Sequence, residues 1–251
     1  MTQSQDNRGQ TAPLQNVRLF HELVHRVKDA PAHLPNWGVF YGMSGNGKTT
    51  AASHAALSTN AIYLEVGSTW STGTLVDSLM HELNMNNVKG SVAKRVIEII
   101  RVLSDDPQPL IFDEADHLVK KSLVDVIREI TDKSKAPVIL IGEQHLPEKL
   151  SQFERAHNRV LDWVEAVPCT FKDAKELLKL YGGKVDIADD LLKKILVDTA
   201  GCTRRIVTNI DRVRNFAITR SLLSIDLATY AKEVEIYRGV PQRLRRQQQV
   251  A

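Results

Sequence analysis

The stretch that decides the fold is Trp37-Gly-Val-Phe-Tyr-Gly42-Met-Ser-Gly-Asn-Gly-Lys48-Thr49. Residues 37–41 are predicted to form a short buried strand, and residues 42–49 then match G-x-x-x-x-G-K-[ST] at every fixed position. Glycines let successive backbone N–H groups turn inward around a phosphate, and the N-terminus of a following helix adds positive potential. The small residues at 49–57 supply such a helix. The stretch therefore predicts a phosphate-binding loop.

This loop contains most of the residues that we expect to bind ATP. Lys48 is expected to reach the β- and γ-phosphates, and the Thr49 hydroxyl to ligate Mg²⁺. The other predicted ATP contacts in and beside the loop are Gly42, Ser44, Gly45, Asn46, Gly47 and Thr50.

A second motif is the acidic end of the predicted strand Leu110-Ile-Phe-Asp113-Glu114. Asp113 is suited to the outer shell of Mg²⁺, and Glu114 is placed to orient and polarise an attacking water. Taken alone, the pair fits an acidic turn before a helix equally well, because Asp and Glu favour helix N-termini. Together with the phosphate loop it favours ATP hydrolysis over a small-molecule kinase. Asp116 and His117 follow at once. Their plainest interpretation is as residues of the first turn of the next helix, and for His117 this interpretation is preferred.

Hydrophobic periodicity organises the rest of the chain into two parts. Predicted strands at 37–41, 61–66, 109–113 and 137–141 alternate with helices, which indicates an α/β fold with a parallel sheet covered by helices on both faces. After residue 170 only helices are expected, at 173–181, 187–199, 203–217 and 225–234. The predicted divisions are a disordered tail (1–16), an α/β domain (17–168), an all-helical lid (169–238) and a basic tail (239–251).

Composition excludes several classes of protein. The 251 residues are 43% hydrophobic and 25% charged, which is ordinary for a globular chain. We expect no membrane span and no secretory signal, and two cysteines are too few for a disulfide framework or a four-ligand zinc site. A cytoplasmic location follows. Residues 201–251 carry 10 Lys and Arg against 4 Asp and Glu, including an Arg/Gln tail that binds DNA or a protein or only solubilises the chain.

The run Asp113-Glu-Ala-Asp-His-Leu118, the phosphate loop and the helical C-terminal part together resemble the AAA+ ATPases. Within them, residues 17–235 are similar to the MuB family of target-DNA-selecting ATPases of phage transposition, with TnsC, TniB and IstB as more distant relatives. The run Glu-Ala-Asp-His-Leu is the most characteristic part of this likeness. The N-terminal helix-turn-helix domain of the phage protein is expected to be absent, because only about 16 residues precede the predicted core.

The resemblance implies further site residues. The segment 153–160 looks like the part of the family that carries an arginine finger, with Arg159 as the first candidate and Arg155 as the second. A guanidinium there would neutralise charge on the γ-phosphate bound by a neighbouring subunit. Arg204 resembles the lid arginine that contacts the nucleotide. Where many AAA+ proteins place Asn or Thr as a sensor after the fourth strand, this chain has Glu143 or Gln144, and slow hydrolysis is the expected consequence.

The resemblance also implies a function. The family assembles with ATP into an oligomer or helical filament on double-stranded DNA, without sequence preference, and stimulates a transposase in the cytoplasm of a bacterial host. Such binding needs cations that face phosphates, and Lys89, Lys94 and Arg95 are the candidates. The alternative is a helicase loader or chaperone-like AAA+ ATPase that acts mainly on a protein partner, because its motifs would be the same.

Overall fold

The computed structural model describes residues 11–85 and 88–239. By their contacts these residues form two compact units, each of which is considered by itself. The sheet unit comprises Asn16–Met43 and Lys48–Ala166. The helical unit comprises the tip of the phosphate loop, Ser44–Gly47, together with residues 11–15 and 167–239.

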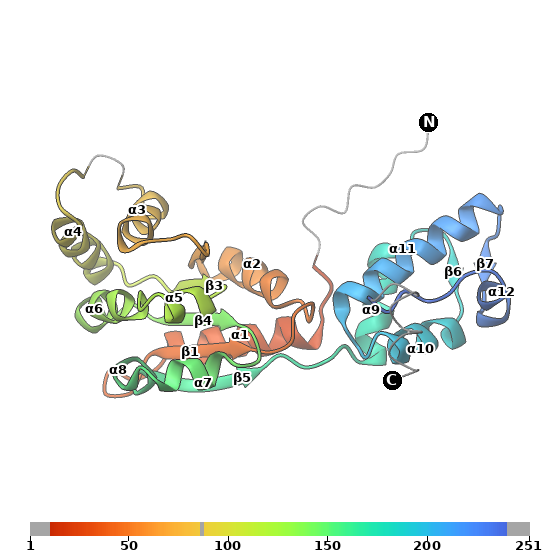
Figure 1. The fold of residues 1–251 in the computed structure, drawn as a ribbon, viewed down its shortest axis with the longest axis horizontal. Coiled ribbons are helices and arrows are strands. Elements are labelled where there is room, and N and C mark those ends of the chain that lie inside the picture. Colours follow the sequence, from red (N-terminus) through yellow and green to blue (C-terminus); the bar gives the residue numbers. More distant parts are fainter. Residues whose placement is uncertain (1–10, 86–87, 240–251) are drawn as a thin grey trace, which may run out of the picture. The chain divides into compact units, whose positions relative to one another are not determined.

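A five-stranded, all-parallel sheet is the centre of the sheet unit, with the strand order β2-β3-β4-β1-β5 (Figure 1). Its strands are β1 (Trp37–Tyr41), β2 (Ile62–Glu65), β3 (Leu110–Asp113), β4 (Val138–Gly142) and β5 (Val160–Glu165). The first four lie where the sequence predicts them. β5 was not predicted, because it is an edge strand of mostly half-buried residues and lacks a continuous apolar run.

Helices cover both faces of this sheet, as expected for an α/β fold. They are α1 (Gln15–Lys28), α2 (Lys48–Thr59), α3 (Thr72–Glu82), α4 (Val92–Asp105), α5 (Asp116–Lys120), α6 (Val124–Ser134), α7 (Leu146–Ser151) and α8 (Glu154–His157). Trp37 and Val39 of β1 point into a core that α3 to α8 complete. The alternate residues Gly38 and Phe40 face α1, where Phe20 packs edge-on against Phe40.

Close packing of α1 on the sheet explains the glycine in the middle of β1. A Cβ at Gly38 would lie 2.9 Å from side-chain atoms of both Leu23 and Val27 on α1. That distance is shorter than any normal carbon–carbon contact, so a larger residue would push the helix away. Helix α1 therefore sits directly against the strand that leads into the phosphate loop.

The helical unit contains α9 (Phe171–Tyr181), α10 (Asp189–Asp198), α11 (Thr203–Thr219) and α12 (Leu227–Ala231). Thr170 and Asp173 form a capping box at the start of α9. The expectation of an all-helical region was wrong in one respect. Two-residue strands β6 (Asp186–Ile187) and β7 (Ser224–Ile225) pair in parallel, and strands this short carry no periodicity that a sequence could reveal.

The predicted tails fall mostly outside the described residues. Of the N-terminal tail, residues 11–16 are described, and Gln15 and Asn16 differ from the expectation of disorder because they form the first turn of α1. Of the basic C-terminal tail only Gly239 is described, so Arg243, Arg245 and Arg246 lie outside. No helix in the described ranges is long and apolar enough to cross a membrane.

Candidate nucleotide-binding site

The phosphate loop joins β1 to α2 and has the backbone that its glycines permit. Gly42, Gly45 and Gly47 adopt positive φ angles of 151°, 88° and 79°, which residues with a side chain rarely adopt. The Lys48 ammonium donates hydrogen bonds to the carbonyl oxygens of Gly42, at 2.7 Å, and Met43, at 3.0 Å. The loop thus folds around the lysine that is predicted to bind phosphate.

Asp113 ends β3 and is held on both carboxylate oxygens. Its side chain is buried, with 3% of the residue exposed. Oδ1 accepts the backbone N–H of Glu114 at 2.9 Å, and Oδ2 accepts the hydroxyl of Tyr63 at 2.9 Å. Tyr63 was not among the predicted site residues. Its position on a strand beside the acidic strand end was the available signal.

Glu114 follows at the surface with an unusual backbone. Its φ of 55° lies in the left-handed region, which is uncommon for a residue with a side chain and is a conformation found at functional sites. Burial, and then the negative charges of Asp113 and Asp116, raise the pKa of Glu114 above its usual range. Burial lowers the pKa of Lys48, and the charges of Asp113 and Glu114 oppose that effect. Lysine and carboxylates therefore act on one another at the carboxyl edge of the sheet.

Asp116 ties the acidic turn to the end of β4. Its carboxylate accepts the backbone N–H of Glu143 at 2.7 Å and the Lys149 ammonium at 2.6 Å. Gly142 is needed beside it, because a Cβ there would collide with an Asp116 oxygen. The contact with Glu143 joins residues that are 27 positions apart, so no local pattern in the sequence indicates it.

The two sensor candidates lie in the same turn, after β4. Glu143 is exposed, and its charge acts on both Lys48 and Glu114. Gln144 is exposed as well. Glu143 therefore belongs to the same group of charges as the phosphate-loop lysine.

The donor set fits ATP with Mg²⁺. Within the described ranges no group of three or more His, Cys, Asp or Glu side chains could hold a metal ion by itself. Magnesium bound to a nucleotide needs no such group, because phosphates and water supply most of its ligands. A hydroxyl at Thr49, exposed at the start of α2 with Thr50, and the carboxylate of Asp113 are the protein ligands such an ion would require.

The arginine-finger candidates lie at the other edge of the sheet. The Arg159 carbonyl accepts the N–H of Trp37, the first residue of β1, whereas the phosphate loop follows the last residue of β1. Five strand residues separate the two edges by roughly 13 Å. Arg155 is exposed on α8, which precedes β5. Arg159 therefore cannot reach a phosphate bound to its own loop.

Arg159 is held by an ion pair at this amino edge. Its Nε and a terminal nitrogen donate to the two oxygens of Asp132 at 2.6 and 3.1 Å, and Arg128 donates to the same carboxylate at 3.1 Å. Hydrogen bonding to Arg159 is the largest cause of a lowered pKa of Asp132. Arg159, Asp132 and the loop before β1 line a pocket of about 610 Å³.

In the helical unit, Arg204 is exposed in the first turn of α11, and its backbone N–H donates to the Gly45 carbonyl at 3.0 Å.

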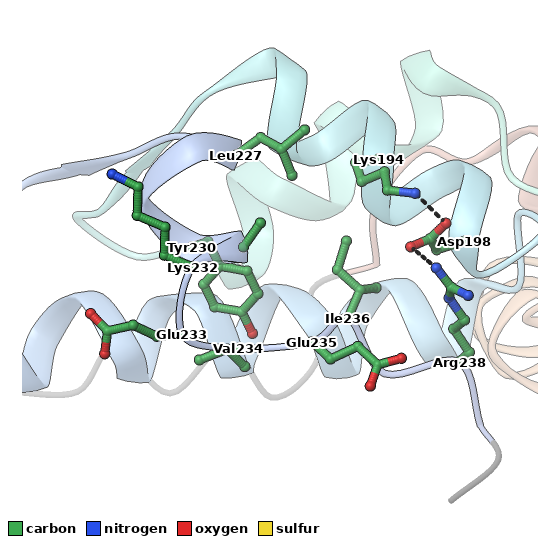
Figure 2. Close-up of a pocket in the computed structure, with 11 residues that line it drawn as sticks. Lys194, Asp198, Leu227, Tyr230, Lys232, Glu233, Val234, Glu235, Ile236 and Arg238 are labelled. Carbon is green, nitrogen blue, oxygen red and sulfur yellow. Dashed lines mark hydrogen bonds and ion pairs between the residues drawn. The ribbon is translucent and has the colours of Figure 1, made fainter. Parts of the chain in front are cut away.

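A separate pocket of about 390 Å³ lies between α10, α12 and residues 232–238. Figure 2 shows the Asp198 carboxylate there between Lys194 and Arg238, both at 2.8 Å. None of the predicted nucleotide or DNA contacts lines this pocket.

The three DNA candidates differ in their availability. Lys89 and Lys94 are exposed. Lys89 lies just before α4, and Lys94 lies in its first turn. Arg95 instead forms an ion pair with Asp77 of α3, and only 17% of its side chain is exposed. Among the described residues no ion pair holds the Lys89 or Lys94 ammonium, so both can meet phosphates, whereas Arg95 ties α4 to α3.

Comparisons with known proteins identify the fold. Residues 33–150 match the model of a family described as an AAA domain. Cdc6p from Pyrobaculum aerophilum is similar with a TM-score of 0.66 and 17% identity, over 86% of this chain and 65% of that one. The Aeropyrum pernix Orc1 protein in complex with DNA is similar with a TM-score of 0.55 and 18% identity, over 82% of this chain and 60% of that one. No curated protein matches significantly.

The fold is therefore that of the AAA+ P-loop ATPases, a parallel five-stranded sheet with helices on both faces. The chain spans less than two thirds of the length of either similar structure. The likeness to the MuB family is finer than these matches resolve and stays a prediction.

Proposed function

We propose that this chain is an AAA+ ATPase that uses ATP and Mg²⁺ to assemble on double-stranded DNA and there regulates a transposase. Its AAA domain and fold support the nucleotide-dependent part, and the sequence resemblance to the MuB family supports the transposition part.

One observation carries the proposal. Lys48, Asp113 and Glu114 gather at the carboxyl edge of the sheet, while Arg159 lies at the amino edge. An arginine that completes an ATPase site must touch the γ-phosphate, and this one can do so only in another copy of the chain. ATP bound at the interface would then favour the assembled state, because it contacts both copies.

Each residue has a part in hydrolysis that follows from its position. The loop amides and Lys48 hold the phosphates, and Thr49 and Asp113 would hold Mg²⁺, which supplies positive charge beside the β- and γ-phosphates. Glu114 accepts a proton from the attacking water, a role that its raised pKa suits. Arg159 of a second copy neutralises charge on the transferred phosphoryl group.

DNA binding rests on separate support. One similar structure is described as a complex with DNA. Exposed Lys89 and Lys94 at the start of α4 offer cations that can meet phosphates without base recognition. The helicase-loader alternative shares the nucleotide site and differs in its partner, so assembly on DNA separates the two.

The test is electron microscopy of the protein with duplex DNA and a non-hydrolysable ATP analogue at low salt. We expect filaments or rings on DNA that require nucleotide. Arg159→Ala should bind ATP with wild-type affinity but fail to assemble, while Arg18→Ala, which removes an exposed arginine paired with Glu22, should assemble normally.

Two results would count against the proposal. If the wild-type protein assembles on DNA neither with ATP nor with the analogue, the DNA-assembly proposal is wrong and the helicase-loader alternative is favoured. Normal assembly and hydrolysis by Arg159→Ala would remove this residue as the finger, and the same experiment on Arg155→Ala would then test the second candidate.

A further inference from the structure

We propose that Tyr63 is a positioning residue for the Mg²⁺ site, because its phenol fixes the carboxylate of Asp113. This inference rests on the proposed ATP-binding function and assigns to it a residue outside the phosphate loop and the acidic strand end.

Strand register places the two side chains together. β2 and β3 pair in parallel, with Tyr63 opposite Ile111 and Glu65 opposite Asp113. Tyr63 and Asp113 are thus two positions apart along neighbouring strands, so they project from the same face of the sheet. A long side chain spans that diagonal, and the phenol oxygen lies 2.9 Å from Asp113 Oδ2.

The Tyr63 hydroxyl is a hydrogen-bond donor, and the ionised carboxylate of Asp113 can only accept. A phenol has an ordinary pKa of about 10, so the Tyr63 hydroxyl stays protonated at physiological pH and can donate. With the Glu114 N–H on Oδ1 and Tyr63 on Oδ2, the carboxylate plane is fixed. Each oxygen keeps a second lone pair, which can accept a water bound to Mg²⁺.

The same phenol connects the two segments that are predicted to hold Mg²⁺. Ser53, one turn after Thr49 on α2, donates to the Thr49 carbonyl at 3.0 Å and lies close enough to Tyr63 to act on its phenol. Tyr63 therefore lies between the helix that carries Thr49 and the strand that carries Asp113. Partners that orient a metal ligand typically change metal affinity about 10–100-fold when they are removed.

The test is Tyr63→Phe, which keeps the ring and removes only the hydroxyl. Equilibrium binding of a fluorescent ATP analogue is measured across a Mg²⁺ titration and again in EDTA. We expect the Mg²⁺ midpoint to rise about tenfold, while affinity in EDTA is unchanged. Tyr181→Phe, which removes a phenol from α9 of the helical unit, is the matched control and should leave the midpoint unchanged.

A second variant separates positioning from simple packing. In an Asp113→Asn background the charge that the phenol holds is gone, so adding Tyr63→Phe should shift the midpoint little further. Equal loss of affinity with and without Mg²⁺, or an unshifted midpoint, would overturn the inference for Tyr63. Wild-type protein that binds no nucleotide in Mg²⁺ would instead overturn the proposed function, so the two failures are distinguishable.

Discussion

The two edges of the five-stranded sheet use charge in opposite ways. At the carboxyl edge, Asp113, Glu114, Asp116 and Glu143 all act on Lys48, and the pKa of Glu114 is raised. At the amino edge, Asp132 is enclosed by Arg128 and Arg159 and its pKa is lowered. The first arrangement gathers more carboxylates than cations, whereas the second encloses one carboxylate between two arginines.

The difference separates a site that needs a ligand from a contact that is complete within the chain. Crowded carboxylates destabilise one another until a cation arrives, which is typical of a functional site. The ion pair of Arg159 is already satisfied, so a phosphate from a second copy must compete with Asp132 for the guanidinium. Removing charge should therefore impair ligand binding or chemistry at one edge and weaken folding at the other.

The largest expected effect on ligand binding is that of Lys48→Ala at the carboxyl edge. A charged hydrogen bond contributes about 1.5–3 kcal/mol, so its loss should weaken ATP binding about 10- to 150-fold. The free energy of unfolding should hardly change, because among the described residues the hydrogen bonds of the Lys48 ammonium go to two loop carbonyls. Calorimetric titration with ATP checks the affinity. Lys133→Ala, which removes an exposed lysine paired with Glu129, is the control and should bind ATP as the wild type does. Retained ATP affinity in Lys48→Ala would contradict the assignment of residues 42–49 as the phosphate-binding loop.

Glu114→Gln should spare binding and slow hydrolysis, by about 10²–10⁴-fold if this carboxylate is the general base. Its raised pKa also sets a pH dependence. The base works only when deprotonated, so the rate should fall as pH drops through a value above the ordinary glutamate pKa of about 4.3. A pH–rate profile of the wild type in the presence of DNA measures that limb. Glu129→Gln, on α6, should leave this acidic fall in rate unchanged. A fall centred on the ordinary glutamate pKa would exclude Glu114 as the group that causes it.

How far the sequence predicts each edge follows from the range of its contacts. Local motifs place Lys48, Asp113 and Glu114 correctly at one strand edge, because glycine spacing and an apolar run with an acidic end are properties of neighbouring residues. Arg159 and Asp132 are 27 residues apart, and Tyr63 and Asp113 are 50 apart, so no local pattern pairs them. Strand β5 was missed for a related reason. Its valines and Trp163 favour a strand, but a half-buried edge position gives them no unbroken apolar run.

The smallest expected effect belongs to the amino edge. Asp132→Asn should lower the free energy of unfolding by about 1 kcal/mol or less, because the pair is partly exposed. The folded-state pKa of Asp132 is lowered, so its contribution is present above the unfolded value of about 3.9 and is lost as pH falls through the folded value. The difference from wild type in denaturant unfolding should therefore be present at pH 7 and vanish only below the folded-state pKa of Asp132.

A double-mutant cycle with Arg159→Ala decides whether this small energy has a functional meaning. If Asp132 only stabilises the fold, the two substitutions show coupling in unfolding, and Asp132→Asn leaves assembly unchanged. If a phosphate from another copy competes with Asp132, Asp132→Asn frees the guanidinium, and assembly on DNA should then begin at a lower ATP concentration. The second result would mean that the ion pair of Arg159 with Asp132 exists only while the chain is unassembled. That ion pair would then compete with the contact between Arg159 and ATP bound by another copy, and so oppose assembly.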